Sequence, residues 1–195
     1  MTTLSSVAVY AASSMQVDPL YFDAARRLGT ALADAGIRLV YGAGKVGLMG
    51  ALADAVLQRG GVVTGVIPQF MVEQGWCHEA CTELLVTADM HERKASICRI
   101  ADAMVALPGG IGTFEELLEC LTWKQLGLHT KPVVILNTGG YYDPLLLCLD
   151  RMVSQRFMRP IHQTMYTAVS TPEEVLPALL AQPAWDASVR KQAQL

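Results

Sequence analysis

The stretch AMVALPGGIGTFEE, residues 103–116, places an apolar run directly before three glycines, a threonine and two glutamates. The run 103–107 is typical of a buried strand, and the pattern from Phe114 to about residue 126 predicts a helix. Glycines let backbone N–H groups approach an anion closely, and the first amides of a helix have no acceptor within it. The stretch therefore predicts a strand, an anion-binding turn and a helix in succession.

The same alternation of strand and helix continues on both sides of this stretch. Strands are predicted at 6–11, 37–41, 62–67, 84–87, 103–107 and 132–136, and helices at 19–35, 48–58, 91–100, 114–126, 142–155 and 172–181, with an edge strand between the last two helices. Several strands are almost wholly apolar, as in a parallel sheet covered on both faces. We expect a doubly wound, Rossmann-like α/β fold in one domain, 1–195, in which 69–81 is irregular and 183–195 is a loosely held tail.

Composition excludes several classes of partner. The 195 residues are 52% apolar, and 15 Lys and Arg against 18 Asp and Glu give a net charge of −3. This balance argues against a nucleic-acid partner, which would need a basic face. No apolar run approaches the roughly 18–20 residues of a membrane helix, so no membrane partner is expected.

The N-terminal residues and the cysteines indicate the cellular compartment. No Lys or Arg precedes the first apolar run, which argues against a secretory signal and favours the cytoplasm. The five cysteines are odd in number and mostly lie in apolar stretches, as reduced thiols do. Cys77 and Cys81 have poor spacing for zinc and no second pair nearby, so we expect no metal.

The glutamates after the glycine turn have two interpretations. Thr113 and Glu116 have the spacing of a capping box, in which Glu116 would only bond back to the start of the helix. Two carboxylates beside an anion site are equally typical of catalysis. Because neighbouring helix positions point about 100° apart, only one of Glu115 and Glu116 is expected to face the cleft.

A second glycine loop, residues 42–47, follows the second predicted strand. Gly42, Gly44 and Gly47 match G-x-G-x-x-G, but no acidic residue follows the next strand, which disfavours a nicotinamide-dependent oxidoreductase. Lys45 is not followed by the Ser or Thr of a phosphate-binding P-loop. Close helix–strand packing and a backbone wall for a sugar or base both remain open.

A basic pair and a serine complete the candidate site. Arg93 and Lys94 lie near a predicted helix start, capped by Asp89, where the helix dipole favours acids. This placement indicates a task such as gripping an anion, and the alternative is a solvated charged face. Ser14, after the first strand, could donate a hydroxyl to a phosphate, or act only as a turn residue.

Taken together, these motifs resemble the LONELY GUY (LOG) family of cytokinin riboside 5'-monophosphate phosphoribohydrolases. Its mark P-G-G-x-G-T-x-x-E is met in full by residues 108–116, its Arg-Lys pair by Arg93 and Lys94, and its Gly-Leu-Met-Gly by residues 47–50. The resemblance implies a Rossmann-like homodimer, in which the helices after Arg93 and Thr113 could pair. It implies hydrolysis of the N-glycosidic bond of AMP or N6-modified AMP, without a cofactor.

The resemblance also implies roles for individual residues. Arg93 and Glu116 would be catalytic, with Glu115 the nearest competitor. The residues expected to bind the nucleotide are Lys94, Gly109, Gly110, Gly112, Thr113, Ser14, Gly42, Gly44 and Thr122. The rival function is a non-catalytic nucleotide sensor or carrier, which would keep the glycine loops but need no carboxylate at the sugar.

Overall fold

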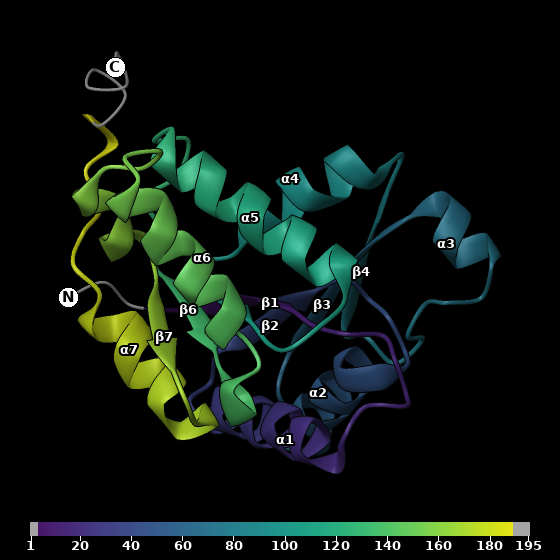
Figure 1. Ribbon diagram of the computed structural model, residues 1–195. Helices are drawn as coiled ribbons and strands as arrows, with labels where there is room; N and C mark the ends of the chain where they lie inside the picture. The colour runs from purple at the N-terminus through teal and green to yellow at the C-terminus, as the bar shows by residue number, and fades with distance from the viewer. Residues whose placement is uncertain (1–3, 189–195) are drawn as a thin grey trace.

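The computed structural model describes residues 4–188, and its centre is a parallel sheet (Figure 1). The seven strands of this part of the chain run in the order β4-β3-β2-β1-β5-β6-β7. Their bounds are β1 (Ser6–Tyr10), β2 (Arg38–Tyr41), β3 (Val63–Pro68), β4 (Glu83–Thr87), β5 (Ala103–Ala106), β6 (Val133–Leu136) and β7 (Thr167–Val169). All six pairings are parallel, which confirms the predicted fold class.

Helices cover both faces of the sheet, as Figure 1 shows. One face carries α1 (Pro19–Asp34), α2 (Gly47–Gln58) and α7 (Val175–Ala181), and the other carries α4 (Met90–Ile100), α5 (Ile111–Gln125) and α6 (Asp143–Ser154). The short α3 (Gln69–Glu73) follows β3, and 3-10 turns lie at Thr138–Gly140, Pro160–Met165 and Pro172–Glu174. None of the helices in residues 4–188 combines the length and apolarity that a bilayer crossing requires.

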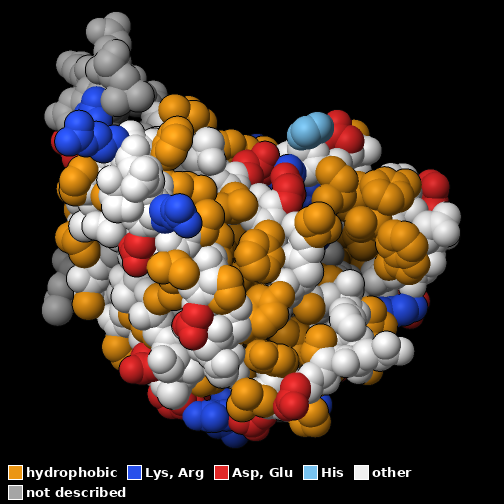
Figure 2. All heavy atoms as spheres, in the orientation of Figure 1, with side chains coloured by type: hydrophobic (Ala, Val, Ile, Leu, Met, Phe, Trp, Pro, Cys, Tyr) orange, Lys and Arg blue, Asp and Glu red, His pale blue; other side chains and the backbone are white. Residues whose placement is uncertain are grey.

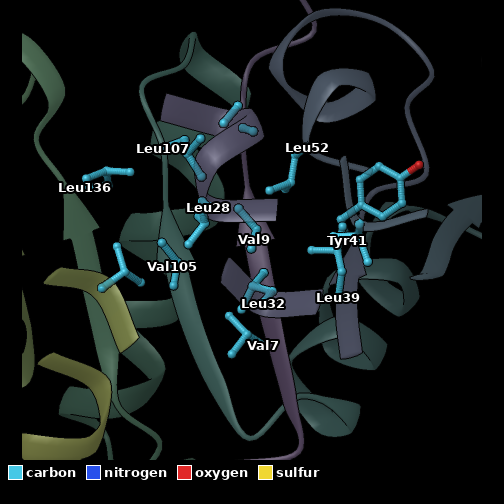
Figure 3. Packing of buried hydrophobic residues seen from close by; sticks show 14 of the residues in the cluster. Val7, Val9, Leu28, Leu32, Leu39, Tyr41, Leu52, Val105, Leu107 and Leu136 are labelled. Carbon is cyan, nitrogen blue, oxygen red and sulfur yellow. The ribbon is translucent and has the colours of Figure 1, made fainter. Parts of the chain in front are cut away.

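The central strand explains why the core has two halves. β1 is buried along its whole length, and alternate side chains point to opposite faces. Val7 and Val9 pack against Leu28 and Leu32 of α1 (Figure 3), whereas Ala8 belongs to the cluster under α4 and α5. Burying each such leucine contributes roughly 1.5–3 kcal/mol, which outweighs the weak intrinsic preferences of these short segments.

The strand order indicates where a ligand crevice is expected. β1 pairs with β2 on one side and with β5 on the other, so the connections after β1 and β5 leave in opposite directions. In open α/β sheets, ligands bind outside the carboxyl ends of the strands at such a switch point. Both glycine loops, after β2 and after β5, lie at this edge.

Three predicted features differ from the structure. The helix predicted from Phe114 begins at Ile111, because the glycines occupy its cap and first turn, where amides need no helical acceptor. The irregular region 69–81 contains the short helix α3. In the predicted loose tail, Trp185 is buried and its indole donates to the Lys124 carbonyl at 2.8 Å, so residues 183–188 are anchored; residues 189–195 lie outside the described part of the chain.

Candidate active site

A buried ion pair lies at the carboxyl edge of the sheet. Asp89 caps α4 by accepting a hydrogen bond from the Glu92 amide at 2.8 Å, and one turn later Arg93 turns inward. The Arg93 guanidinium lies 3.2 Å from a carboxylate oxygen of Glu116 on α5, and the side chains are only 8% and 11% exposed. Arg93 and Glu116, the two residues expected to be catalytic, thus lie in contact although 23 positions separate them in the sequence.

The backbone fixes the Arg93 side chain from the other side. Its Nε donates to the Val66 carbonyl at 3.1 Å, and an Nη donates to the Gly42 carbonyl at 3.5 Å. A methyl group at Gly42 would overlap that Nη atom. Gly42 therefore leaves room for the Arg93 guanidinium. This contact is a reason for the glycine besides the helix–strand packing and the backbone wall that the sequence left open.

Lys94, next to Arg93, pairs with carboxylates of α5. Its ammonium donates to Glu115 and, at 3.1 Å, to Glu119, one helical turn further along α5. Burial works to lower the pKa of Lys94, but these two hydrogen bonds outweigh it and the pKa is raised. Two carboxylates thus pair with this ammonium, and the role of Lys94 in binding the nucleotide stays a prediction. Sequence reasoning missed Glu119, although its spacing of four from Glu115 was a usable signal.

The structure separates the two neighbouring glutamates. Glu115 is 51% exposed, whereas Glu116 is 11% exposed and turned to Arg93. The capping-box interpretation of Glu116 is wrong, because Gly110 is the N-cap and Thr113 lies within the helix. Burial raises the pKa of the Glu116 carboxyl above its ordinary value, and the Arg93 guanidinium opposes the rise without cancelling it.

The glycine turn offers backbone donors beside this pair. Thr113 is buried against Gly109, so closely that a methyl group at Gly109 would overlap the threonine hydroxyl. Methyl groups at Gly110 and Gly112 would meet nothing, since both positions face open space. Within residues 4–188 the amides of 110–113 find no acceptor, so the turn presents a set of N–H groups suited to an anion.

A cavity of about 360 Å³ opens next to Arg93. Its lining is formed by Ser13, Gly42, Gly44, Lys45, Val46, Met49, Ile67, Met71, Trp76 and Arg93. Ser13 rather than Ser14 reaches it, and the Ser14 hydroxyl accepts from the Gln16 amide at 3.2 Å in a local turn. The Thr122 hydroxyl donates to the Leu118 carbonyl of its own helix at 2.7 Å. The hydroxyls of Ser14 and Thr122 thus make local hydrogen bonds, and neither residue lines the cavity.

Charge and apolar surface meet around this edge. Figure 2 shows charged side chains gathered over α4 and α5 and apolar side chains gathered over α3, where Phe70 and Trp76 are exposed. A larger cavity, about 800 Å³, lies at the opposite edge of the sheet, where Arg38 is already paired with Glu83. Among the described residues, no group of three or more His, Cys, Asp or Glu is placed to hold a metal ion.

The fold and site together define a Rossmann-like α/β protein in which a glycine turn, whose amides have no acceptor within residues 4–188, lies beside a buried arginine–glutamate pair. The family model described as "Possible lysine decarboxylase" matches residues 49–179. A cytokinin riboside 5'-monophosphate phosphoribohydrolase of Arabidopsis thaliana is 44% identical over 170 residues, 87% of this chain and 78% of the relative. The corresponding enzyme of Oryza sativa subsp. japonica is also 44% identical over 170 residues, 87% of this chain and 70% of the relative. The chain belongs to this family, the LOG family.

Solved structures share the fold at much lower identity. The molybdenum cofactor binding protein of Rippkaea orientalis has a TM-score of 0.68 and 20% identity, covering 93% of this chain and all of that one. The molybdenum cofactor carrier protein of Chlamydomonas reinhardtii has a TM-score of 0.66 and 21% identity, covering 92% of this chain and 99% of that one. This likeness concerns the architecture alone.

Proposed function

We propose that this chain hydrolyses the N-glycosidic bond of cytokinin-type nucleoside 5'-monophosphates, AMP included, to a free base and ribose 5-phosphate. The named activity of relatives that are 44% identical over most of the chain supports this reaction. The structural observation that carries it is the buried pair of Arg93 and Glu116 beside a turn of unpaired amides.

The carboxylate suits the charge that the reaction develops. Breaking a glycosidic bond builds positive charge on the ribose, which a carboxylate next to the anomeric carbon stabilises. Glu116 is the buried carboxylate at this edge, and the burial that raises its pKa also makes it a stronger base. We assign it to stabilising the ribose cation and taking a proton from the attacking water.

The remaining residues bind and orient. The amides of 110–113 hold the 5'-phosphate, which fixes the ribose against Glu116 and lets remote binding energy lower the barrier. Arg93 keeps Glu116 in place and extends into the cavity. Lys94 orients Glu115 and Glu119 rather than binding the phosphate directly.

A substrate panel tests the proposal. The chain is incubated with AMP, N6-isopentenyl AMP, GMP, CMP and adenosine, and the free base and ribose 5-phosphate are quantified by chromatography. We expect equal amounts of both products from the adenine nucleotides and no cleavage of adenosine, which lacks the phosphate. Binding of AMP without release of adenine would instead establish the sensor or carrier function.

We further propose a homodimer that pairs along α5. Ile111 is 92% exposed and Leu118 is 39% exposed, and with Thr122 they follow the spacing of one helix face. Leu118→Arg is expected to give monomers by light scattering at micromolar concentration, because it puts a charge into an apolar contact. Leu147→Arg on α6, at a position 71% exposed, is the control and is expected to leave the mass unchanged.

The cytoplasm is the compartment we propose for this chemistry. All five cysteines are unpaired, and reduced thiols persist in the cytosol. Cell fractionation with an epitope-tagged chain tests the location.

A further inference from the structure

Two tyrosines outside the predicted site hold the anion-binding turn from behind. The Tyr142 hydroxyl donates to the Leu107 carbonyl, and the Tyr141 hydroxyl donates to the Gly109 carbonyl, both at 2.6 Å. These carbonyls lie on the two sides of Pro108. The sequence around 141–142 gave no signal of this role, because the tyrosines lie more than thirty positions from the turn.

The tyrosines are themselves held firmly. Tyr142 is fully buried, and its ring lies 5.1 Å from that of Tyr141 and 5.4 Å from that of Phe114, which follows the turn. The Tyr142 backbone N–H donates to the Asn137 side-chain oxygen at 2.6 Å, and the Asn137 side-chain Nδ2 donates to the Asp143 carboxylate at 2.7 Å. Tyr142 is thus held within the core, and Tyr141, which is 36% exposed, is held by edge-on ring contacts with Tyr142 and Tyr21.

The geometry of a peptide unit links these bonds to the anion site. In a planar trans peptide the C=O and the N–H point in opposite directions. Holding the Gly109 carbonyl toward Tyr141 therefore aims the Gly110 N–H away from Tyr141. Gly110 faces open space, and its amide has no acceptor within residues 4–188. A glycine turn without such a tether could rotate this peptide at little cost.

We propose that Tyr141 and Tyr142 are positioning residues that preorganise the turn 107–110 for the phosphate end of the substrate. Tyr141 sets the direction of the Gly110 amide, and Tyr142 fixes the end of β5 from which the turn starts. This inference rests on the proposed function only for the identity of the anion as a sugar phosphate.

Tyrosine-to-phenylalanine variants test the inference, since they keep the rings and remove one hydroxyl each. Ribose 5-phosphate binding is measured by calorimetry, and AMP turnover is measured in parallel. We expect Tyr141→Phe to weaken ribose 5-phosphate binding and to raise KM for AMP about fivefold each, the size of one lost hydrogen bond. Tyr142→Phe is expected to act in the same direction, and adenine inhibition is expected to stay unchanged.

Tyr21→Phe is the matched control. Tyr21 packs edge-on against Tyr141 at 5.8 Å, and its hydroxyl makes no hydrogen bond with the turn. Unchanged ribose 5-phosphate binding in Tyr141→Phe, or an equal loss in Tyr21→Phe, would overturn the proposal. If Tyr142→Phe fails to fold, Tyr141→Phe alone decides.

The two proposals fail in different ways. A wild-type chain that binds ribose 5-phosphate but cleaves no nucleotide contradicts the proposed function, and the calorimetry still decides the role of the tyrosines. A lower melting temperature in Tyr141→Phe without any change in ribose 5-phosphate affinity would show a purely structural role and overturn this inference.

Discussion

Arg93 and Lys124 are both buried cations on helices that cover the same face of the sheet, yet their surroundings differ. Arg93 on α4 faces the Glu116 carboxylate beside a cavity. Lys124 on α5 is 1% exposed and donates to two uncharged oxygens, the Met165 carbonyl at 2.7 Å and the Gln182 side chain at 3.0 Å. Of these two buried cations, the one that faces a carboxylate lies at the site, and the one that faces neutral oxygens lies in the framework.

A similar contrast appears between the pKa of Lys124 and that of Lys94, the residue next to Arg93 on α4. Burial lowers the pKa of Lys124 from 10.5 to about 8, because no carboxylate compensates for the lost water. The pKa of Lys94 is raised, because Glu115 and Glu119 more than compensate. Lys124 instead anchors the C-terminal segment. The Gln182 side chain, which accepts from Lys124, also exchanges hydrogen bonds with the Val133 backbone of β6, and the Trp185 indole donates to the Lys124 carbonyl. The charge of the partner, together with the deeper burial of Lys124, distinguishes the two regions.

The largest expected effect comes from removing the charge at Glu116. Glu116→Gln should lower kcat for AMP about 100- to 10,000-fold, because the shape is kept and the carboxylate that stabilises the ribose cation is lost. Glu119→Gln is the matched control, because Glu119 bonds Lys94 and not Arg93. Chromatography of the released adenine gives kcat for both variants. An equal loss of kcat in Glu116→Gln and Glu119→Gln would contradict the separate role of Glu116.

An intermediate effect is expected where the backbone holds Arg93. Gly42→Ala forces a methyl group into the guanidinium, which must leave Glu116, so kcat/KM should fall about 10- to 100-fold. In Gly44→Ala the methyl group would meet only the flexible end of Met49, so a smaller loss is expected. Steady-state kinetics of both variants make the comparison, and a greater loss in Gly44→Ala would show that Arg93 is not held in this way.

The smallest effect on activity is expected at Lys124, where stability changes instead. Because its folded pKa of about 8 lies below its ordinary value of 10.5, Lys124 holds more protons in the unfolded chain between these pH values, and its contribution to stability rises with pH there. The rise is at most roughly 3 kcal/mol. Buried thiols with raised pKa values act in the opposite direction over this range, but equally in wild type and variant. The change in unfolding free energy from pH 7 to pH 10, measured with urea, should therefore be more favourable in the wild type than in Lys124→Met by this increment. The same pH dependence in both chains would exclude Lys124 as a source of stability at high pH.

The comparison also shows how far sequence reasoning reaches. The strands were predicted to within about two residues of their observed ends, because apolar runs bounded by glycine and proline are local signals. Arg93 and Glu116 were selected from motifs, and the structure places them in contact. The start of α5 was not predictable in the same way, since Thr113 and Glu116 fit a capping box as well as an inner turn.

Other features depended on contacts that no local pattern contains. Glu119 lies 25 positions from Lys94, and Tyr141 lies 32 positions from Gly109. In the sequence, Lys124 has the pattern of an ordinary helix residue. In the fold, Gln182 and Trp185 of the C-terminal segment pack over it. Each pair is brought together by the order of strands in the sheet, which decides which helices become neighbours.

By itself, the sequence of this protein determined the alternation of strands and helices, the glycine turns, and the residue types at the site, because these follow from periodicity and from backbone freedom within a few residues. Only the tertiary structure decided which charges pair, which glutamate is buried and which hydroxyls hold the turn. The physical reason is that pairing and desolvation act between residues far apart in the chain, whose distance is set by packing of the whole sheet.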